Sequence, residues 1–366
     1  MRQLTCGFIG LGLIGGSIAR ALRENVFGIK IIAYDTDADT LELAEKDGTA
    51  DITADTIDMR FSVCDYIFLC APVRHNDSNL EIVRKIMKPG CLLTDVGSVK
   101  GGIHESVRRA GLEECFIGGH PMAGSERVGY ANSKAALLEN AYYILTPTPL
   151  VSEESLGEFR ELLESVKAIP LVMTPEKHDY VTAAISHLPH VVASALVNLI
   201  RDSDSADGVM RLTAAGGFKD ITRIASSQAA MWQQICLSNK DNICLLLDNY
   251  INALLLFKKE IDAADADSLY RQFEGARIYR DSFINASSGP IKRCHSVSVE
   301  IADKSGSLAQ ITALLAEQGL NIKNIGITHN RESEDGVLRI EFYDETSMTA
   351  AETLLRGAGF SVSIRI

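Results

Sequence analysis

Short apolar runs alternate with amphipathic stretches along the first part of the chain. The apolar runs predict strands at 4–9, 29–34, 66–70, 91–95, 116–119 and 142–145. Stretches such as 37–46 and 79–87 have the apolar spacing of helices that cover one face of a sheet. Strands that are apolar throughout are buried on both faces, so the pattern predicts a parallel α/β sheet over residues 1–150.

From residue 151 the pattern becomes helical. A helix at 153–166 and a short strand at 169–172 precede long helical segments at 180–200 and 242–261. The apolar faces of these segments are too broad for helices that pack on one side only. We therefore expect an all-α dimerisation domain over 151–285, with its surplus apolar surface buried in a homodimer or a larger homo-oligomer.

A polar linker at 285–290, with the sequence NASSGP, separates the helical region from the last part of the chain. Residues 293–366 then follow the order strand, helix, strand, strand, helix, strand. The segments are 296–301, 307–317, 322–329, 337–343, 347–355 and 360–364. This order predicts a ferredoxin-like module.

Composition and charge narrow the possible partners. The 36 Lys and Arg residues against 48 Asp and Glu give a net charge of −12, which disfavours nucleic acid but still permits a small anion at a few placed cations. We expect no membrane-spanning helix, and the first residues lack the cationic lead of a signal peptide. Eight cysteines without a Cys-x-x-Cys pair favour reduced thiols in a cytoplasmic protein over a disulfide framework or a metal site.

A glycine-rich turn follows the first predicted strand and opens a helix at 14–23. The three glycines permit a tight turn, a close approach of a pyrophosphate to the backbone, and packing of the helix on the strand. The candidate cofactor loop consists of Gly10, Leu11, Gly12, Leu13, Ile14 and Gly15. Asp35 ends the second predicted strand, where a carboxylate can bind a ribose hydroxyl and would repel a 2′-phosphate. The pattern predicts a Rossmann-type NAD site, and additional use of NADP stays open.

Two further loops follow the fourth and fifth predicted strands, on the side where open α/β sheets bind ligands. The first runs from Asp95 to Lys100. The second, at 118–126, places His120 between glycines and a proline. Because the unperturbed pKa of histidine lies near neutral pH, His120 can accept the proton of an alcohol during hydride removal. These features predict a dehydrogenase with His120 as its base.

The helical region holds a second group of candidates. Ser186, His187 and His190 lie in the segment SHLPH, and either histidine could be a core residue. Arg223 follows a glycine turn and could bind a carboxylate in bidentate fashion, which Lys219 can do less well. The only tryptophan, Trp232, could line a pocket or pack in an interface.

Taken together, these motifs resemble those of the prephenate and arogenate dehydrogenases of tyrosine biosynthesis. The resemblance covers the whole predicted catalytic part and rests on GLGLIGGS, YDTD, FLCAPV, DVGSVKG, GGHPMAGSE, SHLPH and GGFKDITR, in that order. It implies the NAD-dependent oxidation of prephenate, with loss of CO2, to 4-hydroxyphenylpyruvate.

The resemblance also implies roles for individual residues. His120 and Ser98 would be catalytic, and Ala71, Pro72 and Ser98 would complete the cofactor site. The substrate site would consist of Arg223, Ser186, His190, Lys219, Glu126 and Trp232. Glu126 and Trp232 would form a gate, and which subunit supplies Trp232 stays open.

The C-terminal module resembles an ACT domain, a regulatory module that binds amino acids. The resemblance implies feedback regulation by tyrosine, with a ligand site made of Asp303, Ser305, Gly306, Asn321 and Ile322. The nature of the amino acid stays open, as does a purely structural role in dimerisation.

Three other functions remain compatible with the sequence. Arogenate or both cyclohexadienyl substrates could be used, because prephenate and arogenate differ only in a keto or amino group. A different NAD-dependent dehydrogenase would need a catalytic lysine, which Lys177, Lys219 and Lys240 do not provide in a recognisable motif. A catalytically silent NAD-binding sensor would not require His120 or Arg223.

Overall fold

The computed structural model describes residues 3–71, 75–124, 127–285, 295–301, 304, 306–329 and 336–364. The chain forms two compact units, Met1–Ala263 and Ala264–Ile366, and each is described by itself.

The first unit is built on an eight-stranded sheet with the order β3-β2-β1-β4-β5-β6-β7-β8. Its strands are β1 (Thr5–Ile9), β2 (Lys30–Tyr34), β3 (Ile52–Ala54), β4 (Tyr66–Leu69), β5 (Leu92–Asp95), β6 (Phe116–Pro121), β7 (Tyr142–Pro147) and β8 (Ile169–Val172). Neighbouring strands are parallel except β6 and β7, which pair antiparallel. The predicted Rossmann-type sheet is therefore present, with one reversed strand that hydrophobicity alone did not reveal.

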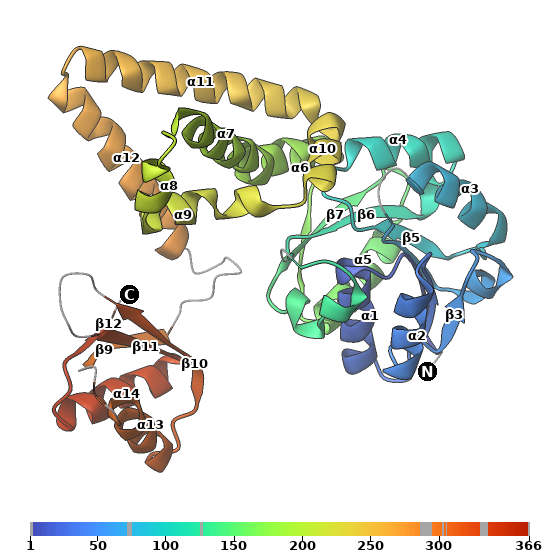
Figure 1. Cartoon of the computed structure of the whole chain (residues 1–366). Helices are drawn as coiled ribbons and strands as arrows, with labels where there is room; N and C mark the ends of the chain where they lie inside the picture. Colours follow the sequence, from blue (N-terminus) through green and yellow to red (C-terminus); the bar gives the residue numbers. More distant parts are fainter. Residues whose placement is uncertain are drawn as a thin grey trace. The chain divides into compact units, whose positions relative to one another are not determined.

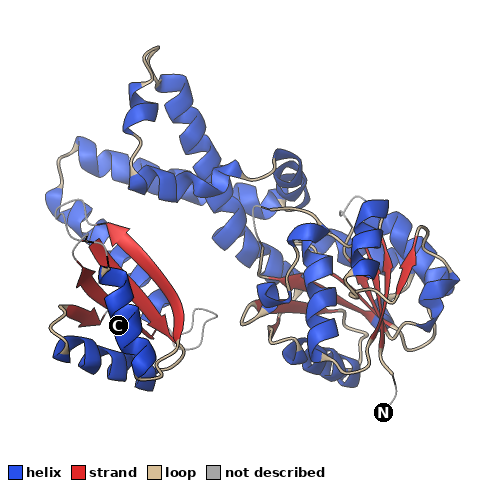
Figure 2. Ribbon diagram, turned by 60° about the horizontal axis from the view of Figure 1, so that its bottom comes forward, coloured by secondary structure: helices blue, strands red, loops and turns tan. Residues whose placement is uncertain are grey.

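Helices cover both faces of this sheet (Figure 2). They are α1 (Leu13–Asn25), α2 (Ala38–Lys46), α3 (Asn76–Ile86), α4 (Gly101–Ala110) and α5 (Glu153–Ser165). Ile18 of α1 and Phe159 of α5 belong to one buried cluster, whereas Leu80 of α3 and Ile103 of α4 belong to another. The continuously apolar strands are thus buried from both sides.

The sheet extends beyond residue 150, where the sequence pattern places the end of the first domain. Residues 151–172 contribute α5 and β8, and β8 pairs in parallel with β7. The prolines at 147 and 149 end β7 but do not end the sheet, because α5 returns the chain to the same edge.

The rest of the first unit is helical, as expected. Its elements are α6 (Pro175–Thr182), a π-helical turn (Ala183–His187), α7 (Leu188–Ser203), α8 (Val209–Thr213), α9 (Gly216–Thr222), a 3-10 turn (Arg223–Ser226), α10 (Ala229–Ser238) and α11 (Lys240–Asp262). Figure 1 shows α11 running beside α7. Large apolar side chains on both helices are exposed, including Leu199, Leu245 and Leu255.

A continuous helical stretch, Pro175–Ser203, is formed by α6, the π-helical turn and α7. It is long and apolar enough to cross a membrane, so the expectation of no such helix is wrong on length and composition. The reason is that residues 180–200 contain no Asp, Glu, Lys or Arg. Length and composition alone do not separate a membrane span from a helix covered by another protein.

Pro189 changes the helix rather than ending it, although the sequence pattern suggested an interruption. Proline has no amide hydrogen for the usual bond to the preceding turn. The chain responds with the π-helical turn Ala183–His187, after which the Leu188 amide donates to the carbonyl of Ala183. Such turns widen a helix locally and are frequent at functional sites.

The second unit contains α12 (Ala266–Asn285) and a four-stranded antiparallel sheet with the order β10-β11-β9-β12. The chain follows the order β9 (His295–Ile301), α13 (Ser307–Glu317), β10 (Ile322–His329), β11 (Gly336–Phe342), α14 (Glu345–Gly357) and β12 (Val362–Ile364). Val299, Ile311, Ile340 and Leu355 are among the residues of its separate buried core.

Candidate active site

The glycine turn joins β1 to α1 as predicted. Gly10 has φ of +94°, and a Cβ at this position would lie 2.6 Å from the backbone nitrogen of Ala71. A Cβ at Gly15 would lie 2.6 Å from the carbonyl oxygen of Gly10. By contrast, a Cβ at Gly12 would meet none of the described atoms within 4 Å. Gly10 and Gly15 therefore permit close packing, and Gly12 leaves the backbone open to a ligand.

The start of α1 also suits an anionic ligand. Leu13 and Ile14 are its first two residues, and Gly12 at the N-cap has no side chain that could satisfy their amide groups. Unpaired amides and the helix dipole together favour a phosphate group at this position.

Asp35 lies beside the glycine turn, directly after β2. Its Oδ2 accepts a hydrogen bond of 2.7 Å from the Leu11 amide, and its Oδ1 accepts one of 3.0 Å from the Asp37 amide. The carboxylate is therefore fixed at the edge of the turn. This is the position at which Rossmann proteins bind the ribose hydroxyls of NAD. Ala71 contacts the same turn from the end of β4, and Pro72 lies outside the described residues.

Lys100 and Asp95 form a buried ion pair between the ends of β5 and β6. The Lys100 side chain is 0% exposed, and its Nζ lies 2.6 Å from both carboxylate oxygens of Asp95. The same ammonium group donates to the Gly119 carbonyl at 2.6 Å. The positive charge of Lys100 is therefore compensated by Asp95 in the interior. The function of Lys100 here is to join the two loops that carry Ser98 and His120.

His120 lies near the end of β6, and Ser98 lies in the loop that follows β5. Because β5 and β6 are parallel neighbours, both loops leave the sheet at the same edge. The Nδ1 of His120 is 2.8 Å from the Nε2 of His178 on α6. Burial is the largest cause that lowers the pKa of His120 well below its usual value. At neutral pH the ring is therefore uncharged, as a proton acceptor must be.

Asp179 connects α6 to the sheet. Its Oδ1 accepts from the Lys100 amide at 2.7 Å, and its Oδ2 accepts from the Gly101 amide at 2.8 Å. Oδ1 also lies 2.7 Å from the Nδ1 of the adjacent His178. Burial raises the pKa of Asp179, but the hydrogen bonds from His178 and the two amides outweigh it and leave the pKa lowered. Asp179 is therefore an ionised carboxylate at the start of α4.

The two histidines of the SHLPH segment have different environments. His187 is 1% exposed, and its Nδ1 lies 3.2 Å from the Nδ2 of Asn239, so it is the buried one. His190 is half-buried, and its Nδ1 donates to the Ser186 carbonyl at 2.9 Å. The His190 ring stacks on Trp232 with 3.6 Å between ring centroids. His190 thus contacts both Ser186, through its backbone oxygen, and Trp232, and their role in a substrate pocket stays a prediction.

Trp232 is partly buried, and its Nε1 is buried without a hydrogen-bond partner within the part of the chain that the structure describes. Burial lowers the pKa of His190, and the charge of Arg223 also lowers it. Arg223 begins the 3-10 turn that packs against α7, the helix that carries His190. Arg223 is exposed at the end of α9, and so is Lys219. Glu126 lies outside the described residues.

The catalytic and substrate candidates are linked by a residue that sequence reasoning missed. Asn239, at the start of α11, donates to the Asp179 carbonyl at 2.7 Å and also contacts His187. His178 and Asp179 were missed as well. The adjacent acid–base pair after Pro175 was visible, but no motif connected it with His120. None of the described residues forms a cluster suited to a metal ion.

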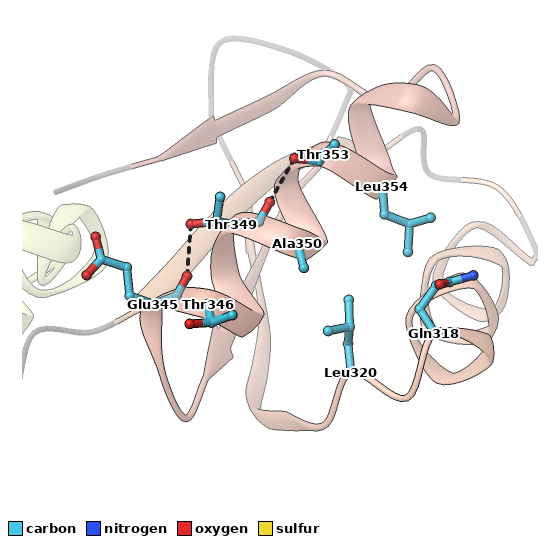
Figure 3. Close-up of a pocket in the computed structure, with 8 residues that line it drawn as sticks. All are labelled: Gln318, Leu320, Glu345, Thr346, Thr349, Ala350, Thr353 and Leu354. Atoms are coloured by element: carbon cyan, nitrogen blue, oxygen red, sulfur yellow. Dashed lines mark hydrogen bonds between the residues drawn. The ribbon is translucent and has the colours of Figure 1, made fainter.

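Three of the predicted regulatory residues are described, and they lie at two chain turns of the second unit. Gly306 precedes α13 with φ of +97°, and Asn321 and Ile322 lie at the start of β10. Asp303 and Ser305 lie outside the described residues. A pocket of about 870 Å³ lies elsewhere, between the end of α13 and one side of α14 (Figure 3). Its lining residues are Gln318, Leu320, Glu345, Thr346, Thr349, Ala350, Thr353 and Leu354.

Comparison with known proteins identifies two segments of the chain. Residues 18–172 match the family "Prephenate dehydrogenase, nucleotide-binding domain", and residues 174–275 match "Prephenate dehydrogenase, dimerization domain". The prephenate dehydrogenase of Bacillus subtilis (strain 168) is 38% identical over 345 residues, which span 94% of this chain and 93% of that protein. The prephenate dehydrogenase of Lactococcus lactis subsp. cremoris is 33% identical and spans 96% of this chain and 97% of that protein.

The chain is also similar to solved structures of prephenate and arogenate dehydrogenases. A prephenate dehydrogenase from Aquifex aeolicus, in complex with hydroxyphenyl propionate and NAD+, has a TM-score of 0.73 and 33% identity, covering 77% of this chain and 99% of that one. An arogenate dehydrogenase from Synechocystis has a TM-score of 0.70 and 29% identity, covering 77% of this chain and 100% of that one. The chain belongs to the prephenate dehydrogenase family of NAD-dependent oxidoreductases.

Proposed function

We propose that this protein oxidises prephenate with NAD to 4-hydroxyphenylpyruvate and CO2 in tyrosine biosynthesis. The observation that carries the proposal is the position of His120, uncharged and at the same edge of the sheet as the glycine turn and Asp35. Membership of the family supports the substrate, since the curated relatives that span the chain are named prephenate dehydrogenases.

The residues present fit NAD. Gly12 leaves room for the pyrophosphate, the start of α1 offers amide groups, and the Asp35 carboxylate can bind ribose hydroxyls. The proposed cofactor site consists of Gly10, Leu11, Gly12, Leu13, Ile14, Gly15, Asp35, Ala71, Pro72 and Ser98. When bound, NAD supplies the acceptor for the hydride. Because Asp35 carries a negative charge, a 2′-phosphate would be repelled, and NAD is the proposed cofactor rather than NADP.

His120 acts on the 4-hydroxyl group of the substrate. As the hydride leaves the carbinol carbon, the ring nitrogen accepts the hydroxyl proton and the C–O bond becomes a carbonyl. The resulting dienone loses CO2, and the electrons of the broken C–C bond restore the aromatic ring as a phenolate. The proton held by His120 can then return to the same oxygen. Ser98, in the loop beside His120, supports the contact with the hydroxyl group.

The substrate carries two carboxylates and needs cations or hydrogen-bond donors at defined places. Arg223 is the proposed partner of the side-chain carboxylate, because guanidinium binds carboxylate in bidentate fashion. Arg223 begins the 3-10 turn that packs on α7, the helix that carries His190. Ser186, His190 and Trp232 line the pocket, and the buried Trp232 Nε1 is a further donor. Lys219 adds positive potential at the rim, and Glu126 and Trp232 form a gate.

The test is the appearance of NADH when the purified protein is mixed with NAD and prephenate, and separately with arogenate. The expected result is turnover of prephenate with a higher kcat/KM than arogenate. Preference for arogenate would reassign the substrate, and the similarity to an arogenate dehydrogenase makes this the second candidate. Absence of NADH with both substrates would favour a silent NAD-binding sensor or another dehydrogenase.

We further propose that the C-terminal module is an ACT domain that binds tyrosine. The support is its βαββαβ element order and antiparallel sheet, together with the positive φ of Gly306, which permits a tight turn at the start of α13. The proposed ligand site consists of Asp303, Ser305, Gly306, Asn321 and Ile322. Titration of the full chain with tyrosine, phenylalanine and tryptophan, followed by heat release and by inhibition, tests it. Heat release without inhibition, or neither, would leave a role in dimerisation.

The oligomeric state follows from the helical region. Exposed apolar side chains on α7, α10 and α11 include Leu199, Leu237, Leu245, Leu254 and Leu255. Surfaces of this kind are normally covered, and this segment matches a dimerization domain. We propose a homodimer or a larger homo-oligomer in the cytoplasm, in which these faces meet. Sedimentation of the full chain would test this, since a monomer at working concentration contradicts it.

A further inference from the structure

We infer that His178 and Asp179 are positioning residues that fix the tautomer of His120, so that the Nε2 of His120 carries the lone pair that faces the substrate. The inference rests on the proposed dehydrogenase function and deepens it. It follows from two consecutive contacts, Asp179 to His178 and His178 to His120, together with the proposed role of His120 toward the reacting hydroxyl group.

The first contact sets the direction of the others. The carboxylate of Asp179 already accepts hydrogen bonds from the backbone amides of Lys100 and Gly101 at the start of α4. An ionised carboxylate can only accept, so the 2.7 Å contact with His178 requires a hydrogen on His178 Nδ1. The two amides at the start of α4 therefore hold the negatively charged Asp179 carboxylate in place beside His178.

The second contact passes this direction to His120. His178 is 0% exposed, and a neutral imidazole with a hydrogen on Nδ1 has a lone pair on Nε2. The His178 Nε2 lies 2.8 Å from His120 Nδ1, so a neutral His178 accepts there and His120 donates. His120 then carries its hydrogen on Nδ1 and its lone pair on Nε2, which is the form that can accept a proton from the substrate.

The charges around the pair favour the same arrangement. The groups that act on His120 are His178, Lys100 and His187, and Lys100 is neutralised by Asp95. When His120 becomes an imidazolium during the reaction, its positive charge is joined through His178 to the negative charge of Asp179. Asp179, His178 and His120 are analogous to the carboxylate and histidine of a serine-protease triad, in which the carboxylate orients the histidine without itself taking up the proton.

Substitution of His178 separates positioning from simple packing. His178→Gln keeps an amide that can donate to Asp179 and accept from His120, whereas His178→Leu keeps volume but neither hydrogen bond. We expect His178→Leu to lower kcat and kcat/KM together by about 10²–10⁴-fold, and His178→Gln to retain most of the activity. His104→Gln is the matched control, because this α4 histidine contacts Thr146 outside the chain of two contacts. The control should leave kcat unchanged.

A spectroscopic measurement tests the tautomer without turnover. The nitrogen chemical shifts of ¹⁵N-histidine-labelled protein distinguish protonated from unprotonated ring nitrogens, and the His120→Asn spectrum identifies the His120 signals by their absence. We expect His120 to be protonated at Nδ1 in the wild type, and to lose this preference in Asp179→Ala, which removes the acceptor that holds the hydrogen on His178 Nδ1.

Three results would overturn the inference. They are a wild-type His120 protonated at Nε2, a His178→Leu variant with wild-type kcat, or equal losses in His178→Leu and His178→Gln. The first of these can be observed whether or not the protein turns over prephenate. A failure of the proposed function would appear instead as no NADH with wild-type protein while the nitrogen shifts still follow the expected pattern.

Discussion

The buried ion pair between Lys100 and Asp95 allows a quantitative prediction for Lys100→Met. The substitution removes three hydrogen bonds from one ammonium group, two to Asp95 and one to the Gly119 carbonyl. Asp95 remains as a carboxylate that is 1% exposed, with the amides of Gly97 and Gly119 as its remaining donors. Removal of one partner from a buried pair costs about 3–5 kcal/mol, because it leaves an uncompensated charge in the interior.

The first unit should therefore melt at a lower temperature. For a unit of this size each kcal/mol corresponds to about 2–4 °C, so Lys100→Met should lower Tm by about 6–20 °C. Differential scanning calorimetry of the full chain measures this shift. The matched control is Lys88→Met, because Lys88 also contacts an aspartate and a carbonyl, Asp65 and Val63, each at 2.8 Å. The Lys88 side chain is 27% exposed, so its loss should cost about 1 kcal/mol or less.

A double variant distinguishes the charge from the packing. In Asp95→Asn combined with Lys100→Met neither charge is buried, so the double variant should be more stable than Lys100→Met alone. Two results would refute the reasoning. One is a decrease in Tm for Lys100→Met that is no larger than the decrease for the Lys88→Met control. The other is a double variant whose loss of stability equals the sum of the losses in Asp95→Asn and Lys100→Met.

Three further predictions concern the site. His120→Asn should reduce kcat by about 10²–10⁴-fold while NAD still binds, and near-wild-type turnover in steady-state assays would remove His120 as the base. Arg223→Ala should weaken prephenate binding by about 2–5 kcal/mol, seen as a higher KM, and unchanged kinetics would exclude Arg223 from the site. Burial lowers the pKa of His187 to about 4, more than the charge of Asp179 raises it, so the folded state binds fewer protons there than the unfolded state. About 3 kcal/mol of stability should thus be present above pH 6.5 and be lost as the pH falls toward 4, and chemical unfolding at several pH values should show a flatter profile in His187→Gln.

The parts of the fold that were predicted correctly are those encoded locally. The glycine turn, its flanking strand and helix, and Asp35 lie within a short segment, and each residue type has a direct steric or electrostatic reason. Antiparallel pairing of β7 could not be predicted in this way, because a buried strand has the same apolar pattern in either direction.

The missed site residues depend on contacts between distant parts of the chain. His120 and His178 are 58 residues apart, and Asp179 and the Lys100 amide are 79 residues apart. No local pattern indicates that such groups meet. Lys100 and Asp95 are close in sequence, but only the tertiary structure shows that both are buried and that Lys100 is a structural residue.

The same contacts connect the sheet and the helical region at the proposed active site. Asp179 belongs to α6 but satisfies the amides that begin α4, and Asn239 at the start of α11 holds the Asp179 carbonyl and contacts His187. A chain ending at Val172 would retain all eight strands and His120, yet His120 Nδ1 would lose its acceptor and α4 would lose the carboxylate at its first turn. The residue proposed to perform the chemistry is thus supplied by the sheet, whereas the histidine and carboxylate inferred to set its tautomer are supplied by the helical region.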